Sequence, residues 1–519
     1  MIRAFLTVSS GTLASRLLGF VRDAMIAALL GTGAVADAFL VAFQLVNVIR
    51  RLLTEGALNA ALVPAWLRLR ETEGDAAAGR FAGRVLGTIG AGLIALTVAI
   101  GLVMPWVIAL VAPGFAGATL QLAVTDARLM LPYLAFAGPA TVLLALSSAQ
   151  GRFALTAFAP LLFNIALIAV MLALLASPHE AGAVATVLAA TVGAAGFLQL
   201  AILMLRRRGD RLATPLRVIL DSEMRGFLGR ALPGMIASSA PQLLIVAGAV
   251  IASSSPSAVS WLYFANRLIE LPLGIVGVAM GTVLIPELTR VVRGGDGLAI
   301  AHAESRALEL AVGLALPATL GLIVLSEPIV RLLFEHGAFA ATDTAATARA
   351  LVFLALGLPA QVLVKALSPA FFAREDTSAP LIATLKAIVV AIIAAVLLGH
   401  FFGAAGIAGA IALGAWSQAL ALVRSGAATF GFSIERASRQ RLPRIIAAAV
   451  LMGALLWLVG PFSGALGAGT HRFVQALGLL ALIAAGLALY AALLAAFGVT
   501  GWREAVQAIR QPPVRDLRA

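Results

Sequence analysis

Apolar residues fill most of the chain in long runs, which are separated by short polar or arginine-containing connections. A helix needs about 20 mostly apolar residues to cross the roughly 30 Å hydrocarbon core of a bilayer. Prolines inside such runs predict kinks or breaks, here at Pro64, Pro139, Pro272, Pro286 and Pro359. The pattern predicts fourteen membrane helices, near 5–30, 36–66, 83–111, 122–148, 157–176, 183–205, 231–252, 258–289, 306–325, 346–372, 379–401, 405–429, 443–462 and 473–497.

Composition agrees with this pattern. Of 519 residues, 61% are hydrophobic and 12% charged, with a mean hydropathy of +1.02, which predicts an all-α polytopic membrane protein. Lysine occurs only as Lys365 and Lys386, so arginine carries most of the formal charge of +13. Because the arginines lie in connections between apolar runs, they indicate membrane topology and not nucleic-acid binding. The chain has no cysteine, which excludes thiol chemistry, and with no cleavage pattern near its start we expect the first helix to be retained.

Arginines also predict orientation, because they accumulate in cytoplasmic connections. The even-numbered connections are basic, as in the second (Arg68, Arg70, Arg80, Arg84) and the sixth (Arg206, Arg207, Arg208, Arg211, Arg217, Arg225, Arg230). The odd-numbered connections contain little beyond Arg331 and Arg472. Both termini are therefore predicted in the cytoplasm.

Two halves of the chain show a repeat at a spacing of about 220 residues, which aligns Pro64 with Pro286 and Arg128 with Arg349. Six helices lie between equivalent positions, so we predict two six-helix lobes in pseudo-twofold relation, with the site between them. The predicted domains are an N-lobe (1–205), a cytoplasmic linker (206–230), a C-lobe (231–430), and two extra helices with a cytoplasmic tail (431–519). Chance similarity between alanine- and leucine-rich helices is the alternative.

The linker contains Leu216, Ile219, Leu220 and Met224 among its arginines. This spacing predicts an amphipathic helix on the cytoplasmic membrane surface. An ordinary solvated loop is an equal alternative.

Ionised residues gather in the first two predicted helices: Arg16, Arg22, Asp23, Asp37, Arg50, Arg51 and Glu55. A charge at the bilayer centre costs about 2.5–3.5 kcal/mol, so together they would cost roughly 20 kcal/mol if they faced lipid. They must therefore face water or one another. A helix that begins near Ala36 would place Asp37, Gln44, Arg51 and Glu55 along one polar stripe. Alternatively, Arg51 and Glu55 only pair with each other along the helix.

Arg267 and Glu270 occupy the equivalent region of the second half. They could form an ion pair within one helix. However, charge clusters in equivalent helices of two repeats favour one central cavity that is charged from both sides.

Catalytic patterns are not visible. Neither lysine follows a phosphate-binding glycine loop, and the five histidines have no metal-ligand spacing. Glu375 and Asp376, the only adjacent acidic pair, fall in a predicted cytoplasmic turn. We therefore expect no enzyme activity, no metal and no cofactor.

Several motifs resemble the MurJ/MviN family of lipid II flippases, in order over nearly the whole chain. They are S-R-L-L-G-F-V-R-D from Ser15, A-D-A-F-L-V-A-F-Q-L-V-N-V-I-R-R-L-L-T-E-G-A-L from Ala36, A-P-G-F from Ala112, S-W-L-Y-F-A-N-R-L-I-E-L-P from Ser260 and L-L-F-E-H-G-A-F from Leu332. The resemblance implies a transporter of the MOP type in the bacterial inner membrane. It also implies that lipid II moves from the cytoplasmic to the periplasmic leaflet by alternating access, with membrane lipids and cell-wall synthesis proteins as partners.

By position, the resemblance implies ten cavity residues: Arg16, Arg22, Asp23, Asp37, Asn47, Arg50, Glu55, Ser260, Arg267 and Glu270. Arginine's planar fork suits a diphosphate, because it donates two hydrogen bonds and keeps its proton. The chain departs from the family at Val46 and Asn266, and the acids with which some members bind sodium are absent from 231–252 and 379–401. The alternative function is export of another polyprenyl-linked saccharide or of drugs by a related MOP exporter.

Overall fold

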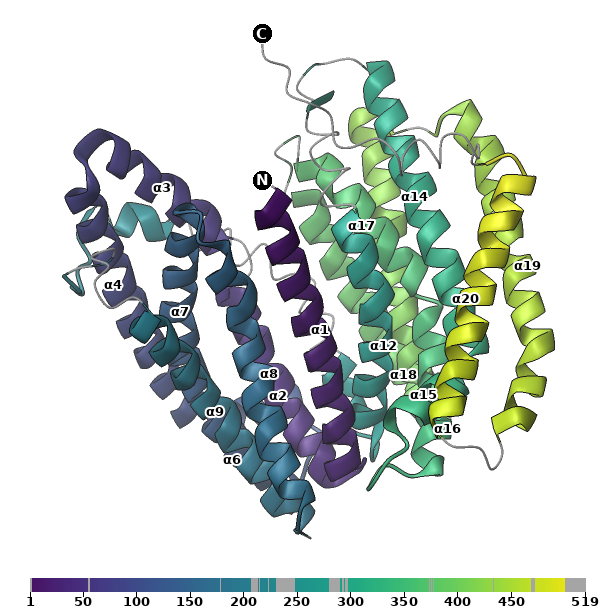
Figure 1. Ribbon diagram of the computed structural model, residues 1–519, viewed down its shortest axis with the longest axis horizontal. Coiled ribbons are helices and arrows are strands. Elements are labelled where there is room, and N and C mark those ends of the chain that lie inside the picture. Colours follow the sequence, from purple (N-terminus) through teal and green to yellow (C-terminus); the bar gives the residue numbers. More distant parts are fainter. Residues whose placement is uncertain are drawn as a thin grey trace. The chain divides into compact units, whose positions relative to one another are not determined.

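The computed structural model describes residues 2–54, 57–177, 179–206, 213, 215–222, 224–229, 248–279, 290–291, 294, 297–372, 374, 376, 378–432, 434–467 and 472–499. All regular secondary structure within these residues is helical (Figure 1). The helices include α1 (Ile2–Leu30), α2 (Ala34–Thr54), α3 (Ala57–Glu73), α4 (Asp75–Leu102), α5 (Met104–Val111), α6 (Gly117–Met130), α7 (Pro132–Ala149), α8 (Phe153–Leu175), α9 (Ala181–Arg206), α12 (Ala258–Ala279), α14 (Gly297–Val324), α15 (Ser326–Phe334), α16 (Ala341–Ala355), α17 (Leu358–Phe372), α18 (Ser378–Phe430), α19 (Arg436–Gly467) and α20 (Arg472–Ala496).

The helices confirm a polytopic membrane protein. Among the described residues, eight helices are long and apolar enough to cross a bilayer, and nine if the bent pair α16 and α17 forms one span. Most of the predicted span 231–252 and the end of span 258–289 lie outside the described residues. Fourteen is therefore an approximate count.

Three predicted spans are broken helices. The span 83–111 forms α4 and α5, and the span 122–148 forms α6 and α7. Pro105 lies in the first turn of α5 and Pro132 begins α7. Backbone N–H groups in the first turn of a helix have no partner within the helix, so a proline there costs no hydrogen bond. Between α16 and α17 the chain bends by 41° just before Pro359, which confirms the break predicted at that residue.

Predicted spans 379–401 and 405–429 follow one another without a loop in α18. Gly403 interrupts the helical backbone between them with φ 57° and ψ −137°. This left-handed conformation is open to glycine at little steric cost. A single glycine thus supplies the break that the sequence predicts between 401 and 405.

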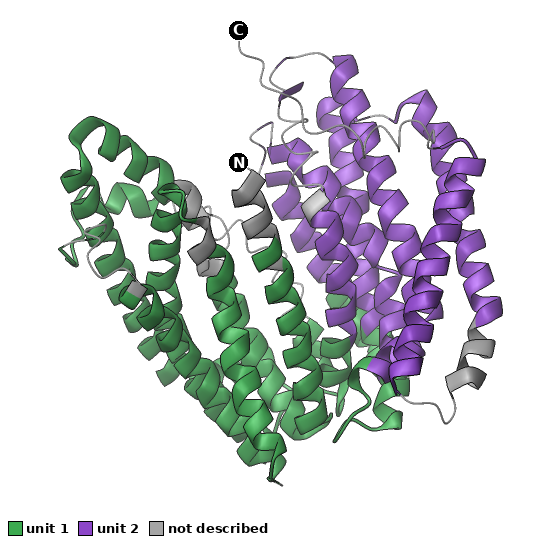
Figure 2. Ribbon diagram, in the orientation of Figure 1, with its two compact units in different colours: residues 1–264, 333–346, 391–407 green, residues 265–332, 347–390, 408–519 purple. Residues whose placement is uncertain are grey.

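The chain forms two compact units (Figure 2). Unit 1 comprises residues 1–264, 333–346 and 391–407, and unit 2 comprises residues 265–332, 347–390 and 408–519. The lobe boundaries read from the repeat stay a prediction.

In unit 1, α1 packs against α8, α2 against α6, and α7 against α4 and α9. Glycines allow close approach on α9: a Cβ at Gly193 would lie 2.3 Å from the carbonyl oxygen of Leu129 in α6. A Cβ at Gly196 would lie 2.9 Å from the Cα of Tyr133 in α7. The small residues of α9 therefore set how tightly this bundle packs.

The predicted linker helix is only partly helical. Among its described residues, 216–221 have no regular secondary structure, whereas 222 and 224–229 are helical. The non-helical part lies along α4, where the Ile219 N–H donates to Thr88 Oγ1 over 3.3 Å and Thr88 Oγ1 donates to the Ile219 carbonyl over 3.1 Å. These contacts give the backbone partners that a helix would otherwise supply, which explains why the single amphipathic helix is wrong.

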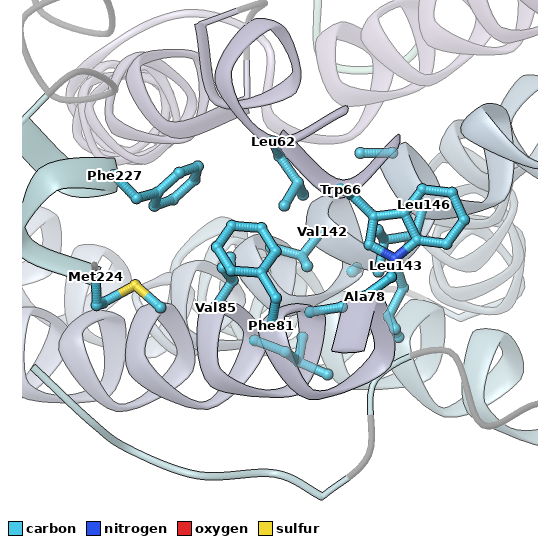
Figure 3. Close-up of a cluster of buried hydrophobic side chains, with 14 of the residues drawn as sticks. Leu62, Trp66, Ala78, Phe81, Val85, Val142, Leu143, Leu146, Met224 and Phe227 are labelled. Carbon is cyan, nitrogen blue, oxygen red and sulfur yellow. The ribbon is translucent and has the colours of Figure 1, made fainter. Parts of the chain in front are cut away.

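The short helix of the linker is anchored by apolar packing. Met224 and Phe227 are buried against Phe81 of α4 and Leu62 of α3 in the cluster shown in Figure 3. The rings of Phe81 and Phe227 meet edge to face, with centroids 5.8 Å apart. The linker is therefore part of the core of unit 1.

In unit 2, α14 packs against α17 and α19, and α20 packs against α19. Two polar contacts fix this arrangement. Arg374 Nη2 lies 3.2 Å from Glu304 Oε1, and the Tyr490 hydroxyl donates to the Gly313 carbonyl over 2.8 Å. Both Glu304 and Gly313 belong to α14, which is thus the central helix of the unit.

Candidate functional site

Arg22 lies in the apolar helix α1, yet it is only 8% exposed. Its Nε and Nη2 donate to Asp23 Oδ1 over 2.9 and 2.6 Å, and its Nη1 donates to Asn164 Oδ1 over 3.0 Å. The guanidinium carbon also lies 5.0 Å from the ring centroid of Phe43 and 5.8 Å from that of Phe163. Its charge is therefore compensated by a carboxylate, an amide and two aromatic faces.

The pair Arg22 and Asp23 contacts three other helices: α2 through Phe43, α8 through Asn164 and Phe163, and α12 through Tyr263. Asp23 is fully buried, and its Oδ1 also accepts a hydrogen bond from the hydroxyl of Tyr263 in α12 over 3.3 Å. Asn164 of α8 donates in turn to the Ser15 carbonyl over 3.2 Å. Sequence reasoning did not single out Asn164 or Tyr263. An amide within the apolar run of α8 is the signal that could have found Asn164.

A second buried contact joins Asp37 at the start of α2 to Ser260 near the start of α12. The Ser260 N–H donates to Asp37 Oδ1 over 2.9 Å, and its hydroxyl donates to the same oxygen. Both residues are buried, and they are 223 positions apart in the chain. The sequence predicted each as a cavity residue, and the structure brings these two together.

The remaining predicted residues of the first two helices are more accessible. Arg16 is exposed on α1, and Arg50 is half-buried on α2 with its Nε 3.4 Å from Asn47 Oδ1. Gln44 and Arg51 are also half-buried, whereas Asp37 is buried. Glu55 lies outside the described residues, so the predicted polar stripe is described only as far as Arg51.

Arg267 and Glu270 form an ion pair within α12. Arg267 Nη1 lies 2.8 Å from Glu270 Oε2, and the two side chains are 22% and 30% exposed. The local pairing that was the alternative is thus present. Both residues belong to unit 2 and the other described candidates to unit 1, so their convergence on one ligand stays a prediction.

Asp343 is a further polar centre, which sequence reasoning did not single out. Its Oδ1 accepts from the Thr32 hydroxyl over 2.6 Å and from Trp261 Nε1 over 3.3 Å, and its Oδ2 accepts from the Ala340 N–H over 2.9 Å. Nearby, the Ala338 N–H donates to the Ala28 carbonyl over 2.8 Å. Residues 333–346 therefore hydrogen-bond to the end of α1, to the Thr32 residue that follows it, and to the start of α12 within unit 1.

The described residues contain no group of three or more potential metal ligands. Two surface hollows contain none of the predicted cavity residues: one is lined by Leu29 and His179, the other by Asp376 and Lys386. What the described candidates offer chemically is arginine held by carboxylates and amides, which is a means to bind phosphate oxygens.

Charged side chains buried in apolar helices, together with the helical fold, define a polytopic membrane protein. The structure is similar to a lipid II flippase MurJ in an inward closed conformation, with a TM-score of 0.78, 21% identity, and coverage of 96% of this chain and 100% of that one. It is also similar to a multidrug resistance MATE transporter of the MOP superfamily in an inward-facing conformation. That match has a TM-score of 0.66, 16% identity, and coverage of 85% and 98%.

Sequence comparison gives the family. Residues 26–476 match the family model described as lipid II flippase MurJ. The chain is 40% identical to a probable lipid II flippase MurJ of Rhizobium meliloti, over 96% of this chain and 94% of the relative. It is 32% identical to the lipid II flippase MurJ of Burkholderia cenocepacia, over 95% and 96%. The chain belongs to the MurJ family of lipid II flippases, as its motifs predict.

Proposed function

We propose that this protein moves lipid II from the cytoplasmic to the periplasmic leaflet by alternating access. Its membership of the MurJ family over residues 26–476 carries the proposal. The arginines supply a physical reason, because lipid II joins its sugar to its lipid through a diphosphate, and arginine binds phosphate oxygens through two donors at once. Arg16, Arg50 and Arg267 are accessible enough to reach a ligand.

In this proposal, Arg22 is held ready by its partners while Arg16, Arg50 and Arg267 contact the diphosphate. Asp23, Asp37 and Glu270 limit the repulsion between the arginines, and Asn47 positions Arg50. Ser260 fixes Asp37, and Glu55 belongs to the same set by position. The cycle breaks no covalent bond, so the protein acts as a carrier and not as an enzyme.

The lipid tail would lie against α19 and α20. Both helices present exposed apolar side chains, among them Trp457 at 68% and Phe473 at 73% exposure. Such surfaces suit acyl or polyprenyl chains, so the polar head could enter the protein while the tail stays in the bilayer. Partners of the cell-wall synthesis machinery would act on the lipid II that is delivered.

The experiment uses cells whose own flippase is depleted. Expression of this chain should restore growth, and lipid II should become accessible to an impermeant reagent on the periplasmic side. Arg50→Ala should leave lipid II in the cytoplasmic leaflet, whereas the matched control Arg331→Ala, an exposed arginine paired with Glu327, should behave as wild type. Unchanged lipid II distribution with altered drug resistance would instead favour the drug-exporter alternative.

Inner-membrane placement with both termini in the cytoplasm belongs to the same proposal, and arginine asymmetry supports it. Since the chain has no cysteine, single cysteines can report topology directly. Labels at Ser255 and Ala338 should react from the periplasm, and labels at Gly209 and Gly294 from the cytoplasm. Any of the four on the wrong side would contradict the predicted topology.

A further inference from the structure

Asp126 in α6 is a buried carboxylate that none of the roles above uses. It is 0% exposed, and neither of its carboxylate oxygens has a hydrogen-bond partner in the described structure. Its buried neighbours on the same helix are apolar: Ala123, Ala127 and Met130 are each 0% exposed. Nearly all buried polar groups in proteins are hydrogen-bonded, so this residue needs a physical explanation.

The helices around α6 provide few charged groups that could compensate an ionised Asp126. Helix α6 packs mainly against α2 and α9, and it also contacts α5 and α7. Residues 181–205 of α9 and all of α5 contain no charged side chain, and the titratable group of α7 is the phenol of Tyr133. Where Gly193 of α9 abuts Leu129, one turn from Asp126, the preceding residues of α9 are alanine, leucine, valine and threonine.

Charged residues on α6 and α2 have other partners. Arg128 of α6 donates through Nε to the Gly101 carbonyl over 3.0 Å. On α2, Asp37 accepts from Ser260, and Arg50 lies against Asn47. Arg51, the remaining charge of α2, donates no hydrogen bond to Asp126, since neither carboxylate oxygen has a hydrogen-bond partner in the described structure. An ionised Asp126 would thus be an uncompensated charge inside an apolar bundle, which is strongly unfavourable, whereas a protonated carboxyl is neutral.

We propose that Asp126 is a proton-binding site of unit 1, whose carboxyl stays protonated while α6 is packed against α2 and α9. The proton would be exchanged only when these helices separate enough for water to reach the carboxyl. A sodium ion is a poorer occupant, because metal cations require several oxygen ligands and Asp126 brings two. Proton binding at Asp126 would therefore stabilise the packed state of unit 1, and this holds for any transported molecule.

The direct test is infrared spectroscopy of the purified full-length protein. A carbonyl stretch from a protonated carboxyl group should be present at pH 7 in the wild type and missing in Asp126→Asn. The band should persist in Asp75→Asn, which alters an exposed carboxylate. A wild-type spectrum at pH 7 without that band would overturn the proposal, and this measurement does not depend on whether the variant folds.

The pH dependence of thermal unfolding gives a second test. An unfolded aspartate ionises near about pH 4, so a folded unit that keeps its proton loses stability as the pH rises above that value. Asp126→Asn cannot ionise, so the unfolding temperature of this variant relative to that of the wild type should rise between pH 5 and pH 8. Equal pH profiles would contradict proton binding, as would a sodium-dependent rise of the wild-type unfolding temperature that Asp126→Asn lacks.

Discussion

Arg22 and Arg267 were predicted to serve one purpose, yet their surroundings differ. Arg22 is 8% exposed and bonded to Asp23 and to Asn164 of another helix. Arg267 has a side chain that is 22% exposed, and it pairs with Glu270 one turn along the same helix. The first arginine depends on the tertiary structure of unit 1, whereas the ion pair of the second could form in an isolated helix.

This difference separates two ways in which an arginine can be essential. Replacing Arg22 should reduce stability as well as function, because the buried carboxylate of Asp23 would lose its cation. Arg267 remains partly accessible, so its removal should disturb ligand binding more than stability. Substitutions at each arginine and its partners can break or sharpen this comparison.

The largest effect is expected for Arg22→Ala. It should lower the free energy of unfolding by about 3–5 kcal/mol, because a buried charge loses its partner, and it should abolish support of growth. Adding Asp23→Asn should recover part of the stability without recovering growth, since the orphan charge is then gone. Thermal unfolding of the purified variants measures the first quantity. Wild-type stability of Arg22→Ala would show that the network is not structural.

A smaller effect is expected for Asn164→Ala. The change removes the acceptor for Arg22 Nη1 and the donor to the Ser15 carbonyl, and lost hydrogen bonds to buried groups cost about 1–3 kcal/mol. Growth should slow but continue, because Asp23 still holds the guanidinium. Thr156→Ala, elsewhere on α8, is a suitable control. Loss of growth without loss of stability would mean that Asn164 contacts the ligand.

Arg267→Ala should change stability by less than about 1 kcal/mol, the usual range for a partly exposed ion pair. It should nevertheless prevent growth in the depleted strain. Arg267→Lys should restore growth only in part, because lysine supplies a point charge in place of a fork. If Arg267→Ala instead destabilised the protein as much as Arg22→Ala, the contrast between the two arginines would be wrong.

The smallest effect concerns Asp221 in the linker, a charge outside the membrane helices. The N–H of Met224, helped by Arg84 and Arg225, holds the pKa of Asp221 below its ordinary value. The stabilising contribution of its ionised form is therefore present above about pH 4 and lost as the pH falls through the lowered pKa. Hydrogen exchange of residues 215–222 should rise at low pH in the wild type and less so in Asp221→Asn. Equal rises would contradict this role.

Sequence alone was sufficient for the fold class, the family and the sites of several helix breaks. Hydrophobic runs locate helices because each crosses the same bilayer thickness, and Gly403 and Pro359 mark breaks through backbone chemistry that is local. The breaks at Pro105 and Pro132 were missed, since each falls inside or beside an uninterrupted apolar run.

Contacts between distant residues were beyond such reasoning. Asp37 and Ser260 were each predicted as cavity residues, but their hydrogen bonds join positions 223 residues apart and need the packed unit. The apolar spacing of the linker suited a helix and left a loop as an equal alternative, and the polar partners on α4 favour a non-helical backbone over 216–221. Asp126 was not singled out, because the burial of its carboxylate depends on how α6 packs against neighbouring helices and no local pattern shows it.

The segment at 333–346 has a consequence for biosynthesis. It completes unit 1 through Asp343, which binds Thr32 although the two are 311 residues apart in the chain. At a synthesis rate of about 5–20 residues per second, Thr32 waits roughly 15–60 s for this partner to leave the ribosome. During that interval the ends of α1 and α2 are in the membrane without their final neighbours, and the N-terminal half of the chain must persist as an unfinished intermediate.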